Sequence, residues 1–300
     1  MALNQENLIK FCSAGCAGRV LNNQELRWSA PGLFDDIFEL SSSSQLTFTH
    51  GELLKATIQM ASSMIFAKDD PKGVSPLAKA IRRWRDEERF DTPEEAEEVL
   101  SELLVQMVDQ RYNEIQTIIQ DWREYSRSVR ICSFSAKAEN MSAWEHYGAA
   151  HTGAALKFRG SDHDDSDFNY PEKVNYKGIC PEITTLKQQL NTIVTANAED
   201  HKDEFRSKLL QKAPHQKDIA EWRCFRYQET EKDSDPKTWF EDIHFETEDL
   251  AAVYFGAFMD EKAKDVLMRL LQKRYRRTKI FQAKIVTGKF ELEFERIMTV

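Results

Sequence analysis

Apolar side chains recur every three to four residues over much of the first half of the chain, which is the spacing of one face of an α-helix. This stripe consists of Leu53, Leu54, Ile58, Met60, Ala61, Met64, Leu100, Leu103, Leu104, Met107, Tyr112, Ile115, Ile118 and Ile119. Thr92 precedes Pro93 and lies three residues before Glu95, a combination typical of a helix N-terminus. The pattern predicts a helical block over residues 50–127, whose stripe packs in a core or covers a sheet.

From Val129 onward, short segments of alternating or β-branched residues replace the helical spacing. They predict strands over residues 129–134, 154–158, 174–176, 221–228, 251–255, 280–286 and 290–294, and a further short strand is expected before the helical block, over 26–29. Ser142 and Glu145 form a second capping pattern, which predicts a short helix ending near Gly153. An amphipathic helix is expected over 261–275, and polar loops over 41–44 and 160–167.

Together these elements predict an α+β fold with a central mixed or antiparallel sheet of short strands. We expect one domain over residues 1–300, with the helical block 50–127 inserted in it and packed on the sheet. Residues 183–212 are polar and helical, which favours a peripheral excursion. No flexible linker flanks the helical block, so we do not expect it to fold as a separate domain.

The composition is that of a soluble globular protein, with a formal net charge of −9 that disfavours a non-specific coat on nucleic acid. The cysteines are odd in number and include no CxxC pair, which disfavours a disulfide scaffold or a structural zinc site. Cys12 and Cys16 can meet on one helical turn, but two thiols do not complete a tetrahedral metal site. Reduced cysteines, no apolar signal core and no membrane-length apolar run predict a cytoplasmic protein without a membrane partner.

The densest group of candidate functional residues is Trp144, His146, Tyr147 and His151. On a helix, Trp144, Tyr147 and His151 share one face, where their rings can stack a planar ligand and donate or move protons. The alternative is a helix packed on a sheet, with its polar ring atoms bonded to backbone groups. Tyr147 and His151 are candidate catalytic residues, and Trp144 and His146 are candidate ligand-binding residues.

A second group is Glu221-Trp222-Arg223, which falls in a predicted strand. Alternation places Glu221 and Arg223 on one face and Trp222 on the other. Glu221 on a rigid strand suits a base or an oxocarbenium stabiliser, and Arg223 suits phosphate. The alternative is that Glu221 and Arg223 form a structural ion pair.

A third group, Asp35, Asp36 and Glu39, brings three carboxylates into five residues. They could bind a divalent cation, but Asp36 equally suits the cap of a turn, so we expect no metal and keep Asp36 as a ligand-binding candidate. The acidic run at 163–167 lacks the spacing and the glycine of a calcium loop, and the basic run at 273–277 suits a helix C-terminus or a phosphate.

The order of these motifs resembles the DUF 2971 family of bacterial proteins. The resemblance is carried by Leu8-Ile-Lys-Phe11, Leu26-Arg-Trp-Ser29 and Phe34-Asp-Asp-Ile-Phe-Glu39, then by Cys132-Ser-Phe-Ser135, Met141-Ser-Ala-Trp-Glu-His-Tyr147, His151-Thr-Gly153, Glu221-Trp-Arg223 and Val253-Tyr-Phe-Gly256. Asp35 and Ile37 depart from the family's asparagine and proline. Asp218 and Ile219 stand where the family often has an aromatic and a first glutamate. The resemblance implies a bacterial or phage-related protein but no activity.

Two functions follow as hypotheses. The first is a binding or sensor module of a defence or stress system, holding a nucleotide or a nucleic-acid end by stacking on Trp144 and Tyr147. The second is an enzyme similar to the ADP-ribosyltransferases, with NAD as its cofactor. Their order of a basic residue, an aromatic residue and a late glutamate would correspond to Lys10 or Arg27, Tyr147 and Glu221.

Both hypotheses require the central helix and the strand of Glu221 to meet at one site. We therefore expect Tyr147 and Glu221 to face the same cleft. If that cleft is open to solvent, replacing Glu221 by glutamine is expected to abolish activity while changing stability little.

Overall fold

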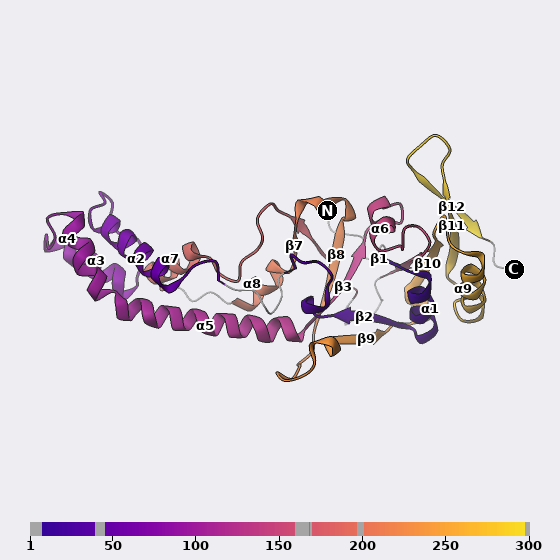
Figure 1. Ribbon diagram of the computed structural model, residues 1–300, viewed down its shortest axis with the longest axis horizontal. Helices are drawn as coiled ribbons and strands as arrows, with labels where there is room; N and C mark the ends of the chain where they lie inside the picture. Colours follow the sequence, from indigo (N-terminus) through magenta and orange to yellow (C-terminus); the bar gives the residue numbers. More distant parts are fainter. Residues whose placement is uncertain (1–7, 40–45, 160–167, 169, 197–200, 298–300) are drawn as a thin grey trace. The chain divides into compact units, whose positions relative to one another are not determined.

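The computed structural model describes residues 8–39, 46–159, 168, 170–196 and 201–297 (Figure 1). The predicted loops at 41–44 and 160–167, with the acidic run 163–167, lie outside the described residues. The chain divides into two compact units. Unit 1 comprises Met1–Glu39, Ser126–Cys180 and Leu210–Val300, and unit 2 comprises Leu40–Tyr125 and Pro181–Leu209. No helix within these described ranges has the length and apolar character needed to span a membrane.

Unit 1 is built on a ten-stranded sheet, which confirms the α+β fold class. The strands run in the spatial order β12-β11-β10-β4-β1-β3-β2-β9, and β8 pairs with β3 and with β5. The pair β10–β11 is parallel and the other pairs are antiparallel, so the sheet is mixed. The strands are β1 (Leu8–Cys12), β2 (Glu25–Ser29), β3 (Val129–Ser135), β4 (Ala154–Phe158), β5 (Glu172–Lys173), β8 (Glu221–Tyr227), β9 (Phe240–His244), β10 (Leu250–Phe255), β11 (Lys279–Ile285) and β12 (Leu292–Ile297).

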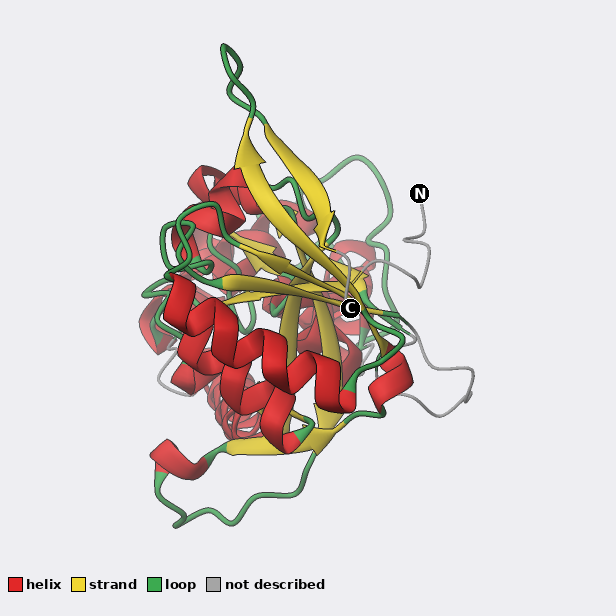
Figure 2. Ribbon diagram, turned by 90° about the vertical axis from the view of Figure 1, so that its right-hand side faces the viewer, coloured by secondary structure: helices red, strands yellow, loops and turns green. Residues whose placement is uncertain are grey.

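Two helices, α1 (Ala14–Asn23) and α9 (Glu261–Arg274), lie side by side across one face of this sheet (Figure 2). Their buried residues, among them Leu21 and Leu271, join Leu156, Val253 and Phe255 of the strands in one apolar core. The shorter elements of unit 1 are α6 (Met141–His146), a small sheet of β6 (Asn175–Tyr176) and β7 (Gln211–Lys212), and the 3-10 turns η1 (Pro31–Leu33), η2 (Pro214–Ile219), η3 (Pro236–Thr238) and η4 (Thr247–Asp249).

Unit 2 is helical in its described residues. It contains α2 (His50–Ile65), α3 (Pro76–Asp86), α4 (Pro93–Leu103), α7 (Leu186–Thr195), α8 (His201–Lys208) and most of α5 (Val105–Ser128). Thr92 caps α4 as predicted, because its side chain accepts a hydrogen bond from the backbone N–H of Glu95. The predicted stripe forms a core of its own, which includes Leu53, Leu100 and Ile115. The packing of the helical block on the sheet stays a prediction.

The central helix differs from its predicted form. Asn140, not Ser142, caps α6, because the Asn140 side chain accepts from the N–H of Ala143 at 3.0 Å. The helix ends at His146, and positive φ angles at Ala149, Ala150 and His151 carry the chain through a tight turn. The prediction that Trp144, Tyr147 and His151 share one helix face is therefore wrong.

Candidate functional site

A cavity of about 260 Å³ lies in unit 1 and brings distant segments of the chain together. Its wall is formed by Ile9, Lys10, Phe11, Leu33, Phe34, Asp35, Asp36, Ser133, Phe134, Ser135, Ala143, Tyr147, Lys212, Ile219, Glu221 and Arg223. The expected convergence of Tyr147 with Glu221 is found, because both residues line this cavity. The combination of apolar walls with a few convergent polar groups is typical of a small-molecule site.

The cavity lies where the sheet parts beside β3. One edge of β3 pairs with β8 from Val129 to Ser135, along its full length. On the other edge, the described residues of β3 pair with β2 only at Ile131 and with β1 only at Ser135. Between these two bridges the Ser133 carbonyl accepts a hydrogen bond from the Lys10 ammonium at 3.0 Å. A lysine side chain thus fills the gap where a neighbouring strand would otherwise pair.

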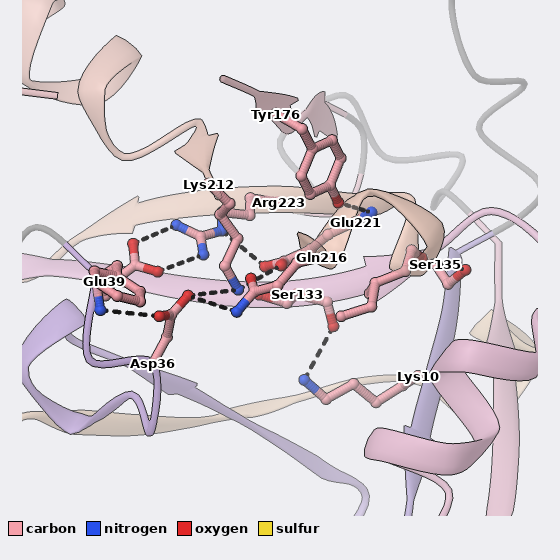
Figure 3. Close-up of polar contacts among 12 residues, drawn as sticks. Lys10, Asp36, Glu39, Ser133, Ser135, Tyr176, Lys212, Gln216, Glu221 and Arg223 are labelled. Carbon is pink, nitrogen blue, oxygen red and sulfur yellow. Dashed lines mark hydrogen bonds and ion pairs between the residues drawn. The ribbon is translucent and has the colours of Figure 1, made fainter. Parts of the chain in front are cut away.

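Arg223 is the centre of a buried ion network in the wall of the cavity (Figure 3). Its Nη1 and Nη2 donate to the two carboxylate oxygens of Glu39 at 2.7 and 2.8 Å, and its Nε donates to Oε1 of Glu221 at 2.8 Å. The Arg223 side chain is 0% exposed, and those of Glu39 and Glu221 are 3% and 5% exposed. The bidentate pair with Glu39 is the strongest arrangement of guanidinium and carboxylate.

Lys212 extends this network from β7. Its Nζ lies 3.0 Å from Oε2 of Glu221 and 3.5 Å from Oδ2 of Asp36, so both oxygens of Glu221 have a cationic partner. Asp36 also caps its own turn, accepting from the N–H of Phe38, and accepts from the Gln216 amide at 3.1 Å. Asp36 is therefore held as a cap and an ion-pair partner. Within the described ranges, no group of acidic, histidine or cysteine side chains could hold a metal ion.

These contacts fix the ionisation of Glu221. Burial alone would raise the pKa of this carboxyl, but the positive charges of Arg223 and Lys212 outweigh it and lower the pKa to about 2. The pKa of Lys212 is raised, because the charge of Glu221 outweighs the effect of burial. Glu221 is a carboxylate at neutral pH with both oxygens engaged, so it does not have the environment of a poised general acid.

Lys10 is the cation of the cavity that has no carboxylate within ion-pair distance among the described residues. Beyond the Ser133 carbonyl, its neighbours are the Phe134 ring, whose centroid lies 5.7 Å from Nζ, and the Cys132 thiol. Burial lowers the pKa of Lys10, but the neighbouring Cys132 and Cys12, followed by the Glu221 carboxylate, outweigh burial and raise it. A charged ammonium with spare N–H donors thus faces the cavity.

Tyr147 supplies the aromatic rim. It is the first residue after α6, its side chain lines the cavity, and the residue is 46% exposed. Burial of part of the ring raises the pKa of its phenol, so the hydroxyl stays protonated at neutral pH. Phe34, whose ring lies 5.4 Å from the Arg223 guanidinium carbon, also lines the cavity and provides a second aromatic surface.

Three candidates from the central segment do not line this cavity. Trp144 is fully buried, its indole N–H donates to the Ala138 carbonyl at 2.8 Å, and its ring packs edge-on against Phe11. The His151 ring stacks on Trp144, with centroids 5.9 Å apart. His146 is exposed and absent from the cavity wall. Trp144 is therefore a packing residue, as in the alternative in which the helix packs on the sheet and its polar ring atom is bonded to a backbone group.

The backbone around His151 explains the local motif. The carbonyl of His151 accepts from the N–H of Phe258 at 3.0 Å, and the carbonyl of Gly153 accepts from the N–H of Gly256 at 2.9 Å. A Cβ atom at Gly256 would lie 2.1 Å from the His151 carbonyl oxygen, so a side chain cannot be placed there without moving the backbone. The His-Thr-Gly segment and the Tyr-Phe-Gly segment thus join the start of β4 to the end of β10.

Arg27 lies apart from the cavity, on β2. It donates to both carboxylate oxygens of Asp242 at 2.8 and 2.7 Å, and its guanidinium carbon lies 3.7 Å from the centre of the Phe240 ring. Of the two basic candidates, only Lys10 reaches the cavity. Arg27 lines a separate pocket of about 150 Å³.

Sequence reasoning missed Lys212 and Tyr176. Lys212 lies on a strand of two residues, and the Tyr176 hydroxyl accepts from the N–H of Glu221 at 2.8 Å. Neither residue stands in a pattern that predicts a site, because their contact with β8 depends on chain segments folding back. Glu39 was visible in the acidic group, but its partner Arg223 is far away in the sequence. Comparison with family models, curated proteins and solved structures finds no match for this chain.

Proposed function

We propose that the cavity of unit 1 binds a nucleotide or the phosphate-bearing end of a nucleic acid. The observation that carries this proposal is Lys10, a half-buried cation without a carboxylate partner among the described residues, facing a cavity rimmed by Tyr147. A cationic group with free donors suits a phosphate, and an aromatic rim suits a base.

The contacts of Arg223, the residue first considered for phosphate, favour a different task for it from that of Lys10. Arg223 already directs Nε, Nη1 and Nη2 at carboxylates, so a ligand would have to displace Glu39 or Glu221 to reach it. Lys10 requires no such displacement. Lys10 therefore binds the negative group in this proposal, and Arg223 holds the wall rigid.

The size of the cavity restricts how much of the ligand enters it. A volume of about 260 Å³ lies below the common range of roughly 300–1,000 Å³ for complete small-molecule sites. A base or a ribose phosphate fits this space, whereas the remainder of a dinucleotide or an oligonucleotide extends past Tyr147 into solvent. Binding of an end, or of a mononucleotide, is the arrangement that this volume favours.

Calorimetric titration of the full chain with ATP, GTP, NAD and a 5′-phosphorylated oligoribonucleotide tests the proposal. We expect at least one of these ligands to bind, with an affinity that falls as salt rises. Lys10→Met should weaken binding at least tenfold, and Tyr147→Ala should weaken it as well. Lys279→Met is the matched control, because Lys279 is an exposed lysine of the same sheet that does not line the cavity.

Equal affinity of the Lys10→Met and Lys279→Met variants would refute the proposal. Circular dichroism melting curves establish that each variant is folded before it is titrated. If Lys10→Met does not fold, Tyr147→Ala decides, since this half-exposed rim residue has little packing to lose.

A second candidate is an ADP-ribosyltransferase-like enzyme that uses NAD. The observation in its favour is that Lys10, Tyr147 and Glu221 line one cavity in the expected chain order. In this reading Tyr147 stacks the nicotinamide and Glu221 stabilises the oxocarbenium-like transition state. Engagement of both Glu221 oxygens by Arg223 and Lys212 favours the binding function over it. If the protein releases nicotinamide from NAD and the Tyr147→Ala variant does not, the enzyme would be favoured over the binding function.

We also propose a family, a biological role and a cellular location for the protein. The motif order that resembles the DUF 2971 family supports membership of that family, which implies a bacterial or phage-related protein. A sensor or effector role in bacterial defence or stress is a separate part of the proposal, because the family itself supplies no activity. The thiols of Cys12, Cys16 and Cys132 are not in disulfides, which suits a cytoplasmic location. Survival of bacteria that express the protein, measured under nucleotide stress or phage infection and compared with survival of a strain that expresses the Lys10→Met variant, tests this role.

A further inference from the structure

Two cysteines lie at the junction of β1 and α1, outside the cavity described above. Cys12 is the last residue of β1 and is buried, and Cys16 lies in the first turn of α1. Ser13 between them is the N-cap, and its hydroxyl accepts from the N–H of Cys16 at 3.3 Å. The helix start therefore folds Cys16 back towards Cys12.

The two thiols are hydrogen-bonded to each other. This bond lowers the pKa of Cys16 to about 6, against the effect of its partial burial, and the charges of Arg19 and Lys10 lower it further. The same bond, together with burial, raises the pKa of Cys12. At neutral pH, Cys16 is thus a thiolate that accepts a hydrogen bond from the neutral thiol of Cys12.

Cys16 is also accessible. It lines a surface pocket of about 150 Å³ together with Arg19, Asn23 and Arg27. Arg27 is engaged with Asp242, whereas Arg19 is exposed and contacts the Cys16 sulfur. A nucleophilic sulfur therefore faces solvent beside a positive charge.

The remaining cysteines provide an internal contrast. Cys132 and Cys224 are buried opposite one another on β3 and β8, and Cys180 is exposed. Burial raises the pKa of the Cys132 thiol, so it is neutral at pH 7. Cys16, in contrast to the buried Cys132, combines exposure to a pocket, a lowered pKa and a thiol within hydrogen-bonding distance.

We propose that Cys12 and Cys16 form a redox-active dithiol that reduces low-molecular-weight disulfides bearing negative charge, with Cys16 as the attacking thiolate. Arg19 binds a carboxylate of the disulfide and brings one of its sulfurs to Cys16. The activity is independent of the function proposed for the neighbouring cavity.

The reaction proceeds by two exchanges. The Cys16 thiolate attacks one sulfur of the disulfide, the sulfur–sulfur bond breaks, and the other half leaves as a thiolate that takes up a proton from water. Cys12 then loses its proton to solvent and attacks the Cys16 sulfur, which releases the second half of the substrate as a thiol. The protein dithiol is oxidised by two electrons to a Cys12–Cys16 disulfide, and the substrate disulfide is reduced to two thiols.

The test uses the full chain in a Cys180→Ser background, which removes the other exposed thiol. The probe is 5,5′-dithiobis(2-nitrobenzoate), an aromatic disulfide with two carboxylates whose released thiolate is coloured. We expect rapid release of two thiolates per chain, and peptide mass spectrometry should identify a Cys12–Cys16 disulfide. Cys12→Ser should stop at a mixed disulfide with one thiolate released, and Cys16→Ser should lose the rapid phase.

A pH profile separates a reactive thiolate from a merely accessible thiol. The rate of the rapid phase should rise with an apparent pKa of about 6 in the parent protein. Arg19→Gln should shift that pKa upward and slow the reaction severalfold at pH 7, whereas Lys279→Gln should change neither value. A midpoint at or above pH 8.5, about the value of an ordinary cysteine, would overturn the proposal, as would a final product without the Cys12–Cys16 disulfide.

Discussion

Two arginines on strands of the same sheet make similar contacts in opposite surroundings. Arg223 on β8 and Arg27 on β2 each donate to both oxygens of a carboxylate at distances between 2.7 and 2.8 Å. The Arg223 side chain is 0% exposed and that of Arg27 is 57% exposed. The hydrogen-bond lengths agree, although Arg27 donates through Nε and Nη2 and Arg223 donates to Glu39 through Nη1 and Nη2, so exposure to solvent is the main difference between the two pairs.

Solvent decides what each pair contributes. Water competes for the charges of Arg27 and Asp242 and screens them, so an exposed pair of this kind contributes about 0–1 kcal/mol. Water does not reach the buried charges around Arg223. Loss of one charged partner therefore leaves the remaining charges buried and unpaired in an apolar wall. The comparison teaches that Arg27 is a surface clamp between β2 and β9, and that Arg223 is a structural centre of the cavity.

The largest expected difference is in the response to removing the guanidinium. Arg223→Met leaves Glu39 and Glu221 without their main cation, and we expect the free energy of unfolding to fall by about 3–5 kcal/mol. Arg27→Met removes an exposed pair and a contact with Phe240, and should cost about 1 kcal/mol. Urea denaturation followed by circular dichroism measures both values.

Equal losses in the two variants would show that burial does not separate the pairs. If Arg223→Met does not express in folded form, Arg223→Lys serves instead. It keeps the charge and loses the bidentate geometry, and it should still cost more than Arg27→Lys.

The pH dependence of stability distinguishes the same two regions. The pKa of Glu221 is about 2 in the folded protein against an ordinary value of 4.5. Because the folded pKa is lowered, the stabilisation is complete above pH 4.5 and is lost as the pH falls towards 2. A shift of this size corresponds to about 3 kcal/mol.

Urea denaturation at a series of pH values between neutrality and pH 2 measures this loss. The acid-induced decrease should shrink by about 3 kcal/mol in Glu221→Gln, which cannot lose a proton at this position. Asp242→Asn is the control, because Asp242 is exposed and its lowered pKa, due first to Arg27, acts through a screened contact. An unchanged pH profile in Glu221→Gln would assign the acid sensitivity to other groups.

A smaller effect is expected from Glu221→Gln at neutral pH. The small change in stability was expected for an open cleft, whereas Glu221 is 4% exposed and paired with Arg223 and Lys212, which favours a measurable loss. Each cation keeps a second carboxylate, Glu39 for Arg223 and Asp36 for Lys212. We therefore expect a loss of about 1.5–3 kcal/mol, typical of buried hydrogen bonds to charged groups, against about 0–1 kcal/mol for Asp242→Asn.

Thermal and urea unfolding of Glu221→Gln and Asp242→Asn, measured in parallel, check this order. Ligand titration of the folded Glu221→Gln protein then separates its two roles. A destabilised variant that still binds the ligand assigns Glu221 to the wall of the cavity, whereas loss of binding in the folded state makes it a ligand contact.

The fold could be predicted where one local pattern dominates. Thr92 and the apolar stripe after it predict α4 and α5, and the alternation at residues 129–134 predicts β3. The strand β9 was missed, since Phe240–His244 mixes acidic and apolar residues without a run of β-formers. Its pairing with β2 depends on contacts such as Arg27–Asp242, which no local pattern reveals.

The candidate site could be predicted in part. Tyr147 and Glu221 were identified because polar groups between core-like segments are conspicuous in a sequence, and both line the cavity. His151 was grouped with them by helical spacing, but the helix ends at His146, so its ring packs on Trp144 instead. Lys212 could not be predicted, because its partners Asp36 and Glu221 come from segments that meet only in the folded chain.

The smallest expected effect is the response of each pair to salt. A double-mutant cycle of Arg27 and Asp242 should give a coupling energy of roughly 0.5–1 kcal/mol at low ionic strength. At about 1 M salt the screening length falls to about 3 Å, and the coupling should approach zero because both side chains are exposed. The matched cycle of Lys212 and Glu221, whose side chains are 6% and 5% exposed, should keep most of its coupling energy. Urea denaturation of the parent protein and of the single and double variants, at both salt concentrations, gives the coupling energies of the two cycles. If salt weakens both couplings by the same fraction, water reaches the Lys212–Glu221 pair, and the cavity wall is open enough for Glu221 to meet a ligand directly.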